Sequence, residues 1–184
     1  MRRTRKTVKS EEEMYTLAAS FVNALKAKSH KLKAATIIGL TGELGTGKTT
    51  FVKGVARALG VREIVTSPTF VIMKIYKLPK RRVSGSTSNF PAFAPASAFA
   101  GASADKSAGK QLPASSPWRH LVHIDTYRLE SPEELRALGW DEIARDPANL
   151  IMIEWVEKVR LLLPRGYCAI SFKCTDESTR RVLL

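Results

Sequence analysis

A length of 184 residues suits one folded domain and leaves little room for a second. The apolar fraction of 44% can form a core without disulfides or a metal, and no apolar run approaches the ~20 residues that span a bilayer, which argues against a transmembrane helix. The formal charge of +13 favours an acidic partner, but residues 1–10 and 79–118 contribute +5 and +4 of it. These charges are either solvated and flexible or in contact with RNA, and the sequence leaves both interpretations open.

The chain begins with a basic segment, residues 1–9, that we expect to be flexible. The segment lacks the apolar core of a secretory signal, and a short organellar presequence is one interpretation of it. Ser10 and Glu13 have the spacing of a capping box and predict the start of a helix, along which apolar residues recur at helical spacing from Met14 to Leu25. We therefore expect a single folded domain over residues 10–184.

A glycine-rich loop lies between an apolar run over residues 35–40, typical of a buried parallel strand, and a helical stretch over 48–59 that ends at Gly60. The loop matches the phosphate-binding pattern G-x-x-x-x-G-K-[ST] at every required position. Glycines let successive backbone N–H groups point at phosphate oxygens, Lys48 can contact the terminal phosphates, and the Thr49 hydroxyl can ligate Mg²⁺. A chance glycine-rich turn is the alternative, but the strand before it and the helix after it favour a P-loop. The predicted nucleotide-binding residues here are Gly42, Glu43, Leu44, Gly45, Thr46, Gly47, Lys48, Thr49 and Thr50.

Two segments of different character follow. Ser67 and Thr69 precede a predicted strand over residues 70–76, in a loop that could sense the γ-phosphate or its metal, although an ordinary turn explains the same residues. In residues 79–118, 25 of 40 residues are Ala, Ser, Pro or Gly. A segment with so little to bury predicts a disordered surface insertion that joins two adjacent strands.

Two later apolar runs each end in a carboxylate. Residues 120–124 lead to Asp125, and residues 150–153 lead to Glu154 and then Trp155. Open α/β sheets bind ligands at the carboxyl ends of parallel strands, so both acids should point into the crevice beside the P-loop. A triphosphate site needs acids to hold a metal and orient water, which makes Lys48, Asp125 and Glu154 the candidate catalytic residues. For each acid the alternative is a surface carboxylate at a strand end, and Trp155 is either a core residue or a stacking surface.

The remaining elements complete the fold class. A helix is predicted from Ser131, a short helix over residues 156–163, and two closing strands over residues 167–174 and 181–184. Strands that alternate with helices predict a P-loop NTPase-type α/β fold, with a mostly parallel sheet flanked by helices. Cys168 and Cys174 would lie about 20 Å apart on one strand, so we expect no disulfide between them and a reducing compartment.

Several short motifs occur in a fixed order along the chain. They are G-E-L-G-T-G-K-T-T over residues 42–50, S-P-T-F over 67–70, H-I-D-T-Y-R-L over 123–129, E-E-L over 133–135 with Gly139, and I-E-W over 153–155. Together they resemble the TsaE (YjeE) family, the small ATPases of bacterial-type tRNA threonylcarbamoyladenosine synthesis. The resemblance covers about residues 10–163 apart from the insertion, and more weakly the last strands.

This resemblance implies a function for the whole chain. A TsaE-like protein binds ATP with Mg²⁺ and hydrolyses it to ADP while bound to TsaD-like and TsaB-like partners. It meets tRNA indirectly, through that complex, and supports turnover of the TsaD-like transferase. The expected location is cytoplasmic, or a mitochondrion or plastid if the source is eukaryotic.

The resemblance also implies roles for individual residues. Thr49 and Glu154 would ligate Mg²⁺, Lys48 would contact phosphate, and Asp125 would be a Walker-B-like acid needed for hydrolysis. Ser67 and Thr69 would belong to a switch region, and Trp155 would lie near the nucleotide and the partner face. Glu11 and either Arg180 or Arg181 would approach the adenine.

Two other functions fit the same residues. A small-molecule kinase could use the P-loop, but it needs an acceptor pocket and usually an Arg-bearing lid, which the Ala/Ser-rich insertion is poorly suited to form. A non-catalytic, nucleotide-gated module could bind RNA through its basic segments, in which case binding would depend strongly on salt.

Overall fold

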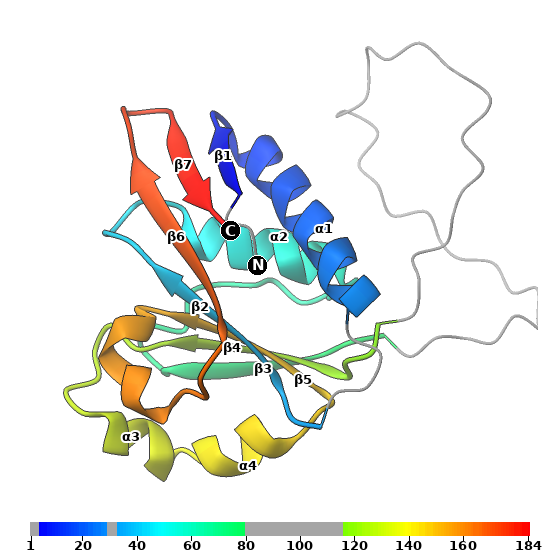
Figure 1. Ribbon diagram of the computed structural model, residues 1–184, viewed down its shortest axis with the longest axis vertical. Coiled ribbons are helices and arrows are strands. Elements are labelled where there is room, and N and C mark those ends of the chain that lie inside the picture. Colours follow the sequence, from blue (N-terminus) through cyan, green and yellow to red (C-terminus); the bar gives the residue numbers. More distant parts are fainter. Residues whose placement is uncertain (1–3, 29–32, 80–115) are drawn as a thin grey trace, which may run out of the picture. The chain divides into compact units, whose positions relative to one another are not determined.

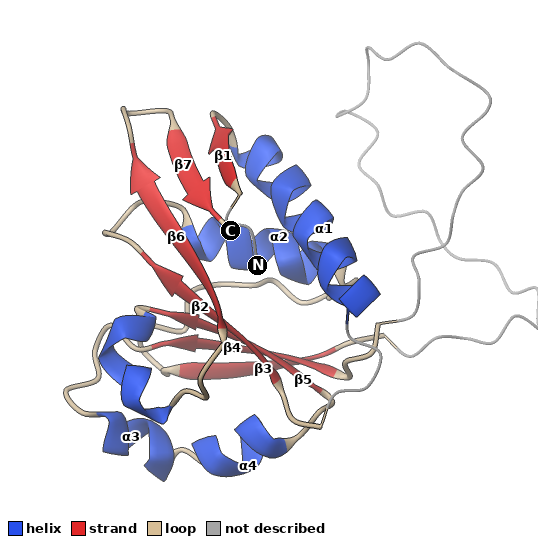
Figure 2. Cartoon of the chain, in the orientation of Figure 1, coloured by secondary structure: helices blue, strands red, loops and turns tan. Residues whose placement is uncertain are grey.

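The computed structural model describes residues 4–28, 33–79 and 116–184, which belong to one compact unit built on a seven-stranded sheet (Figures 1 and 2). The strands are β1 (Arg5–Val8), β2 (Thr36–Thr41), β3 (Met73–Lys77), β4 (His120–Asp125), β5 (Asn149–Glu154), β6 (Cys168–Cys174) and β7 (Arg180–Leu183). The helices are α1 (Glu11–Lys28), α2 (Lys48–Ala58), α3 (Pro132–Ala137), α4 (Trp140–Arg145) and the 3-10 helix η1 (Val156–Leu162). No helix in the described part of the chain is long and apolar enough to cross a membrane.

The sheet has the order β1-β7-β6-β2-β5-β4-β3. Its four central strands, β6, β2, β5 and β4, pair in parallel, whereas β3 on one side and β7 and β1 on the other are antiparallel. Parallel strands need crossover connections, and helices supply them here. The predicted α/β fold with a mostly parallel sheet is therefore confirmed.

Helices cover both faces of the central strands, which accounts for the continuously apolar character of β2, β4 and β5. Helices α1 and α2 pack on one face around Phe51, with Phe21 and Phe172 at ring-centroid distances of 5.5 and 5.6 Å. Helices α3, α4 and η1 cover the opposite face of β2, β5 and β4, where Trp140 and Leu135 are buried. The central strands are thus packed on both faces, and their carboxyl ends lie along one edge of the sheet.

Local signals placed most helix ends correctly. The Glu13 backbone N–H donates to Ser10 Oγ at 3.1 Å, while the Glu13 carboxylate accepts from the Lys9 backbone N–H at 2.7 Å, one residue earlier than a strict capping box. Helix α3 begins after Ser131 with a complete capping box and Pro132 at its first turn. Helix α2 ends before Gly60, which has a φ of 79°.

Three predictions need correction. The basic segment over residues 1–9 is not flexible throughout, because β1 pairs with β7 and Val8 is buried; residues 1–3 lie outside the described residues. The strand predicted over residues 70–76 begins only at Met73, after a turn closed by hydrogen bonds to the Pro68 carbonyl. The prediction of a surface insertion over residues 79–118 fails at its end, because Trp118 is buried and its Nε1 donates to Thr36 Oγ1 at 2.9 Å.

The rest of that insertion, residues 80–115, lies outside the described residues. The segments before and after it, β3 and β4, pair in antiparallel register, as expected for an insertion between adjacent strands. Both cysteines lie on β6, at its opposite ends, so the predicted separation along one strand is confirmed.

Candidate functional site

The glycine-rich loop runs from the end of β2 to the start of α2. Gly42 and Gly47 have φ angles of 137° and 97°, in the region that favours glycine. A Cβ on Gly42 would lie 2.4 Å from the backbone oxygen of Phe172 in β6, so only glycine fits there. Gly47 precedes the first residue of α2, where unpaired N–H groups and the helix dipole favour an anion.

Lys48, the first residue of α2, is 4% exposed and folds back over the loop. Its Nζ donates to the carbonyl oxygens of Gly42 and Glu43 at 2.6 and 2.9 Å. The same Nζ lies 3.9 Å from the ring centroid of Trp155, a cation–π distance. Burial lowers the Lys48 pKa from its ordinary value, and the nearby carboxylates, Glu154 first, oppose that shift. The ammonium is thus held beside the loop in a partly desolvated position, where an anion would interact with it strongly.

The Glu154 carboxylate is 3% exposed and has two side-chain partners. Thr49 Oγ1 lies 2.9 Å from each of its oxygens, and His123 Nε2 lies 2.8 Å from Oε1. His123 Nε2 and Thr49 Oγ1 thus meet the same carboxylate oxygen, Oε1. The arrangement aims one carboxylate at the first turn of α2 from the end of β5.

Asp125 is held in a second, separate cluster. Its Oδ2 accepts from Ser67 Oγ at 2.8 Å and from Thr69 Oγ1 at 2.5 Å, and its Oδ1 accepts from the Tyr127 backbone N–H at 3.0 Å. The side chain is 3% exposed. Asp125 and Glu154 are direct neighbours in the parallel pairing of β4 and β5. Two neighbouring strand ends thus present two carboxylates, one bound to the P-loop helix and the other to the 67–69 loop.

The chain turns sharply after Glu154. Trp155 has a φ of 58°, which is uncommon for a residue other than glycine. Thr126 fixes this turn, because its Oγ1 lies 3.0 and 2.7 Å from the carbonyl oxygens of Glu154 and Trp155. The indole ring is also packed against Tyr127, with ring centroids 5.1 Å apart. The strained residue therefore places an aromatic face beside Lys48.

The P-loop, the two strand-end carboxylates and Trp155 line one cavity of about 370 Å³. Its walls are formed by Leu44, Gly45, Thr46, Gly47, Lys48, Thr49, Thr50, Ser67, Thr69, Asp125, Tyr127, Glu154 and Trp155. Four of the predicted site residues are not among them. Gly42 and Glu43 instead supply the carbonyls that bind Lys48, and Glu11 is an exposed residue that accepts a hydrogen bond from Tyr15.

Arg181, the fourth, is exposed on β7, and its neighbour Arg180 is the one that reaches the loop. Arg180 Nε lies 3.4 Å from the Gly45 carbonyl oxygen. Alternate residues of a strand point to opposite faces, so the two arginines cannot both face the loop. Of the two alternatives, the structure brings only Arg180 to the P-loop.

The family described as "Threonylcarbamoyl adenosine biosynthesis protein TsaE" matches residues 8–84 and 110–182. The chain belongs to the TsaE family. Relatives named tRNA threonylcarbamoyladenosine biosynthesis protein TsaE include that of Rickettsia typhi, 29% identical over 95% of this chain and 89% of the relative, and that of Rickettsia felis, 30% identical over 93% and 73%. The relative from Bacillus subtilis is 29% identical over 82% of this chain and 69% of its own length.

A solved structure agrees with the TsaE fold. The crystal structure of Bacillus subtilis YdiB superposes with a TM-score of 0.60, at 22% sequence identity, covering 99% of this chain and 84% of that one. At this identity the likeness supports the P-loop NTPase-type fold alone. The TsaE assignment rests on the sequence match, which spans both sides of the insertion.

Sequence reasoning missed three residues of this TsaE site. His123, Thr126 and Tyr127 entered the sequence analysis only as members of a motif, whereas His123 and Thr126 bind Glu154 and Tyr127 lines the cavity. For His123 a signal existed, because a polar side chain two residues before Asp125 on one strand points to the same face as that acid. Nothing in the local pattern indicates that Thr126 would bond across to β5.

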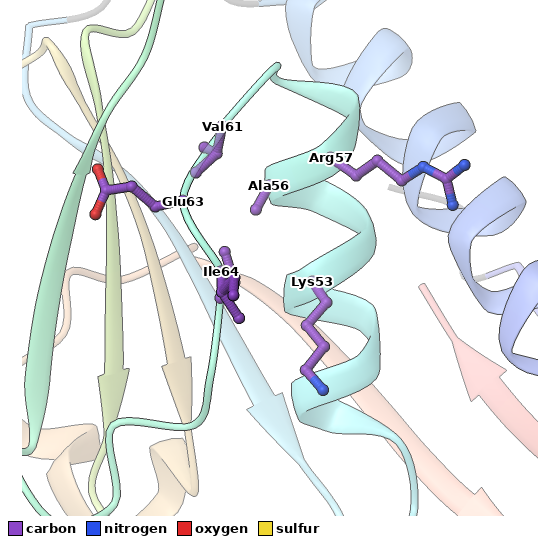
Figure 3. A pocket seen from close by; sticks show the side chains of 7 residues that line it. Lys53, Ala56, Arg57, Val61, Glu63 and Ile64 are labelled. Carbon is purple, nitrogen blue, oxygen red and sulfur yellow. The ribbon is translucent and has the colours of Figure 1, made fainter. Parts of the chain in front are cut away.

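A second cavity, of about 300 Å³, lies between α2 and the segment that follows it (Figure 3). It is lined by Lys53, Ala56 and Arg57 of α2 and by Val61, Glu63, Ile64 and Val65 of the segment that follows. None of the predicted site residues lines it. It lacks the paired carboxylates and the glycine-rich loop of the first cavity.

Proposed function

We propose that this chain binds ATP with Mg²⁺ and hydrolyses it as an accessory ATPase of tRNA threonylcarbamoyladenosine synthesis. The observation that carries the proposal is the meeting of Lys48, Thr49, Asp125 and Glu154 around one cavity in a chain of the TsaE family. The proposed partners are a TsaD-like transferase and a TsaB-like protein, with tRNA reached through them. The description of the family and the names of its relatives supply the pathway.

The residues fit a magnesium nucleotide. Mg²⁺ prefers oxygen ligands and usually keeps several waters, taking one or two protein ligands together with substrate phosphates. Thr49 Oγ1 and the Glu154 carboxylate, 2.9 Å apart, provide two such oxygens. Among the described residues there is no cluster of three or more His, Cys, Asp or Glu side chains that could hold a metal without a nucleotide. This donor set suits a metal that arrives with ATP.

The chain's own groups divide the remaining tasks. Loop N–H groups and Lys48 bind the phosphates, the Thr49–Glu154 pair holds the metal, and either Asp125 or Glu154 orients the attacking water. When bound, Mg²⁺ neutralises negative charge on the phosphates. Trp155 covers Lys48 and limits its contact with water. Asp125 also holds Ser67 and Thr69, so the loop over residues 67–69 would respond to any change at that carboxylate.

Binding and turnover of Lys48→Ala and Glu154→Ala test the site directly. We expect Lys48→Ala to lose most ATP affinity, and Glu154→Ala to lose the gain in affinity that Mg²⁺ gives. Lys53→Ala is the matched control, because Lys53 lies exposed on the same helix and outside the nucleotide cavity. Wild-type turnover in both site variants, or no detectable binding of ATP or ADP with Mg²⁺ to the wild type, would refute the proposal.

The partner role needs a separate test. Affinity-tagged protein is incubated with extract of its source organism in the presence of ATP, ADP or no nucleotide, and bound proteins are identified. Recovery of a TsaD-like protein that depends on nucleotide, and that Lys48→Ala abolishes, would support an accessory ATPase. Stoichiometric phosphorylation of a small acceptor without any protein partner would instead indicate a kinase.

A further inference from the structure

Three strands at one edge of the sheet lie beyond the part of it that α3, α4 and η1 cover. Strands β6, β7 and β1 lie side by side at this edge (Figure 1). Phe172, Val182 and Val8 point from these strands into the core beneath α1 and α2. The second core, under α3, α4 and η1, includes no buried residue of β1, β6 or β7. No helix of the described residues therefore packs on the opposite face of these three strands.

The side chains on this uncovered face follow from the register. Lys173, Arg181 and Thr7 are direct neighbours across the three strands, and Ser171, Leu183 and Arg5 form the adjacent row. Lys173, Arg181, Arg5, Thr7 and Ser171 are all exposed, and we call this set the basic strand face. Its three cations lie close together, because directly opposed Cβ atoms are about 4.5–5.5 Å apart and diagonal ones about 7–8 Å apart.

The electrostatics of this face are unfavourable for the isolated protein. Like charges directly opposite each other, such as Lys173 and Arg181, destabilise a sheet. The three strands contain no Asp or Glu, and no salt bridge joins these cations to any residue that the structure describes. The nearest acid in sequence, Asp176, binds Ser178 and Thr179 within the β6–β7 turn. A ligand with several negative charges would remove the repulsion.

The composition of the face selects among anionic ligands. Protein interfaces need apolar or aromatic anchors, and membrane surfaces need apolar side chains that insert. No large, exposed apolar side chain of the described residues lies on β1, β6 or β7. Nucleic-acid backbones, in contrast, are bound by Arg and Lys together with hydroxyl groups, which is what this face offers.

We propose that the basic strand face binds RNA phosphates directly, so that this chain contacts tRNA itself and not only through its partners. The choice of tRNA rests on the proposed function. The nucleotide cavity and the basic strand face are distinct, since none of Arg5, Lys173 and Arg181 lines the cavity. RNA binding therefore does not require the P-loop residues to take part.

The test compares two charge-matched variants of the full chain. The face variant carries Arg5→Gln, Lys173→Gln and Arg181→Gln, and the control variant carries Lys53→Gln, Arg136→Gln and Arg145→Gln, which removes the same charge from exposed helix positions. Labelled tRNA transcript is titrated by fluorescence anisotropy over a range of salt concentrations. Binding of Mg²⁺ and ATP is measured on the same proteins by calorimetry.

Counterion release sets the expected size of the effect. Each neutralised phosphate contributes about 0.7–0.9 to the slope of log affinity against log salt, so the face variant should have a slope shallower by about 2–3. The ratio of wild-type tRNA affinity to face-variant tRNA affinity should therefore fall by about 20- to 40-fold between roughly 50 and 200 mM salt. The control variant should keep most of the wild-type slope and affinity.

Each outcome decides a separate point. Equal tRNA affinity of the face and control variants, with intact ATP binding, would overturn the RNA-binding face and leave the proposed ATPase standing. If the face variant loses binding to phosphatidylserine vesicles but keeps its tRNA affinity, the RNA-binding face is likewise overturned. If ATP binding fails in the wild type while tRNA binding depends on the face, the ATPase proposal falls and the RNA-binding face survives.

Discussion

Replacing His123 by phenylalanine should weaken both the fold and the proposed metal site. His123 is fully buried and Glu154 is 3% exposed, so water has little access to replace the hydrogen bond between Nε2 and Oε1 at 2.8 Å. A hydrogen bond to a charged group contributes about 1.5–3 kcal/mol to stability. His123 Nδ1 has no partner among the described residues, and removing that unsatisfied atom recovers about 1 kcal/mol of the loss. The net expected loss is about 0.5–2 kcal/mol.

Urea and thermal unfolding measure this loss. For a domain of about 150–250 residues, 0.5–2 kcal/mol corresponds to a fall in Tm of roughly 1–8 °C. His123→Gln is the matched control, because its amide can donate from near the position of Nε2, and we expect it to retain more stability. Far-UV circular dichroism verifies that both variants are folded.

A second readout separates positioning from packing. Without His123, Thr49 is the one side chain among the described residues that still bonds to the Glu154 carboxylate. Loss of a residue that orients a metal ligand typically lowers metal affinity by about 10- to 100-fold, so the gain in ATP affinity on adding Mg²⁺ should shrink by about tenfold or more. Affinity for ATP in EDTA should stay near wild type. The reasoning is refuted if His123→Phe matches the wild type in stability and in its Mg²⁺ dependence.

Two further substitutions test the fold around the site. Trp118→Ala should lower the free energy of unfolding by about 3–5 kcal/mol, because it empties a buried site and removes the bond to Thr36. Trp118→Phe should cost less, and equal stability of all three proteins in urea would contradict the placement of Trp118. Gly42→Ala should abolish ATP binding by displacing the loop from the Phe172 carbonyl, which a Cβ would approach to 2.4 Å. Gly45→Ala is the matched control, because a Cβ there meets nothing within 4 Å. It should lower the free energy of unfolding by only about 1–2 kcal/mol, the cost of a left-handed backbone at alanine. The same ATP affinity in both variants would argue against the steric account.

Signals that act over a few residues were visible in the sequence. The P-loop spacing, the cap at Ser131 and the apolar runs that became β2, β4 and β5 are all local patterns, because hydrogen bonding and side-chain periodicity repeat within one element. The expectation that Asp125 and Glu154 end parallel strands also came from such runs. Membership of the TsaE family could be inferred because its motifs are short and keep their order along the chain.

Contacts between distant segments decided the rest. Strand β1 has an exposed, basic sequence, and only its pairing with β7, some 175 residues later, makes it a strand rather than a flexible end. Trp118 looked like part of a low-complexity segment until its burial beside Thr36 placed it in the core. The bond from His123 to Glu154 and the choice of Arg180 over Arg181 at the loop depend on sheet order and strand direction. Strand pairing is set by the whole set of competing partners, which no local pattern encodes.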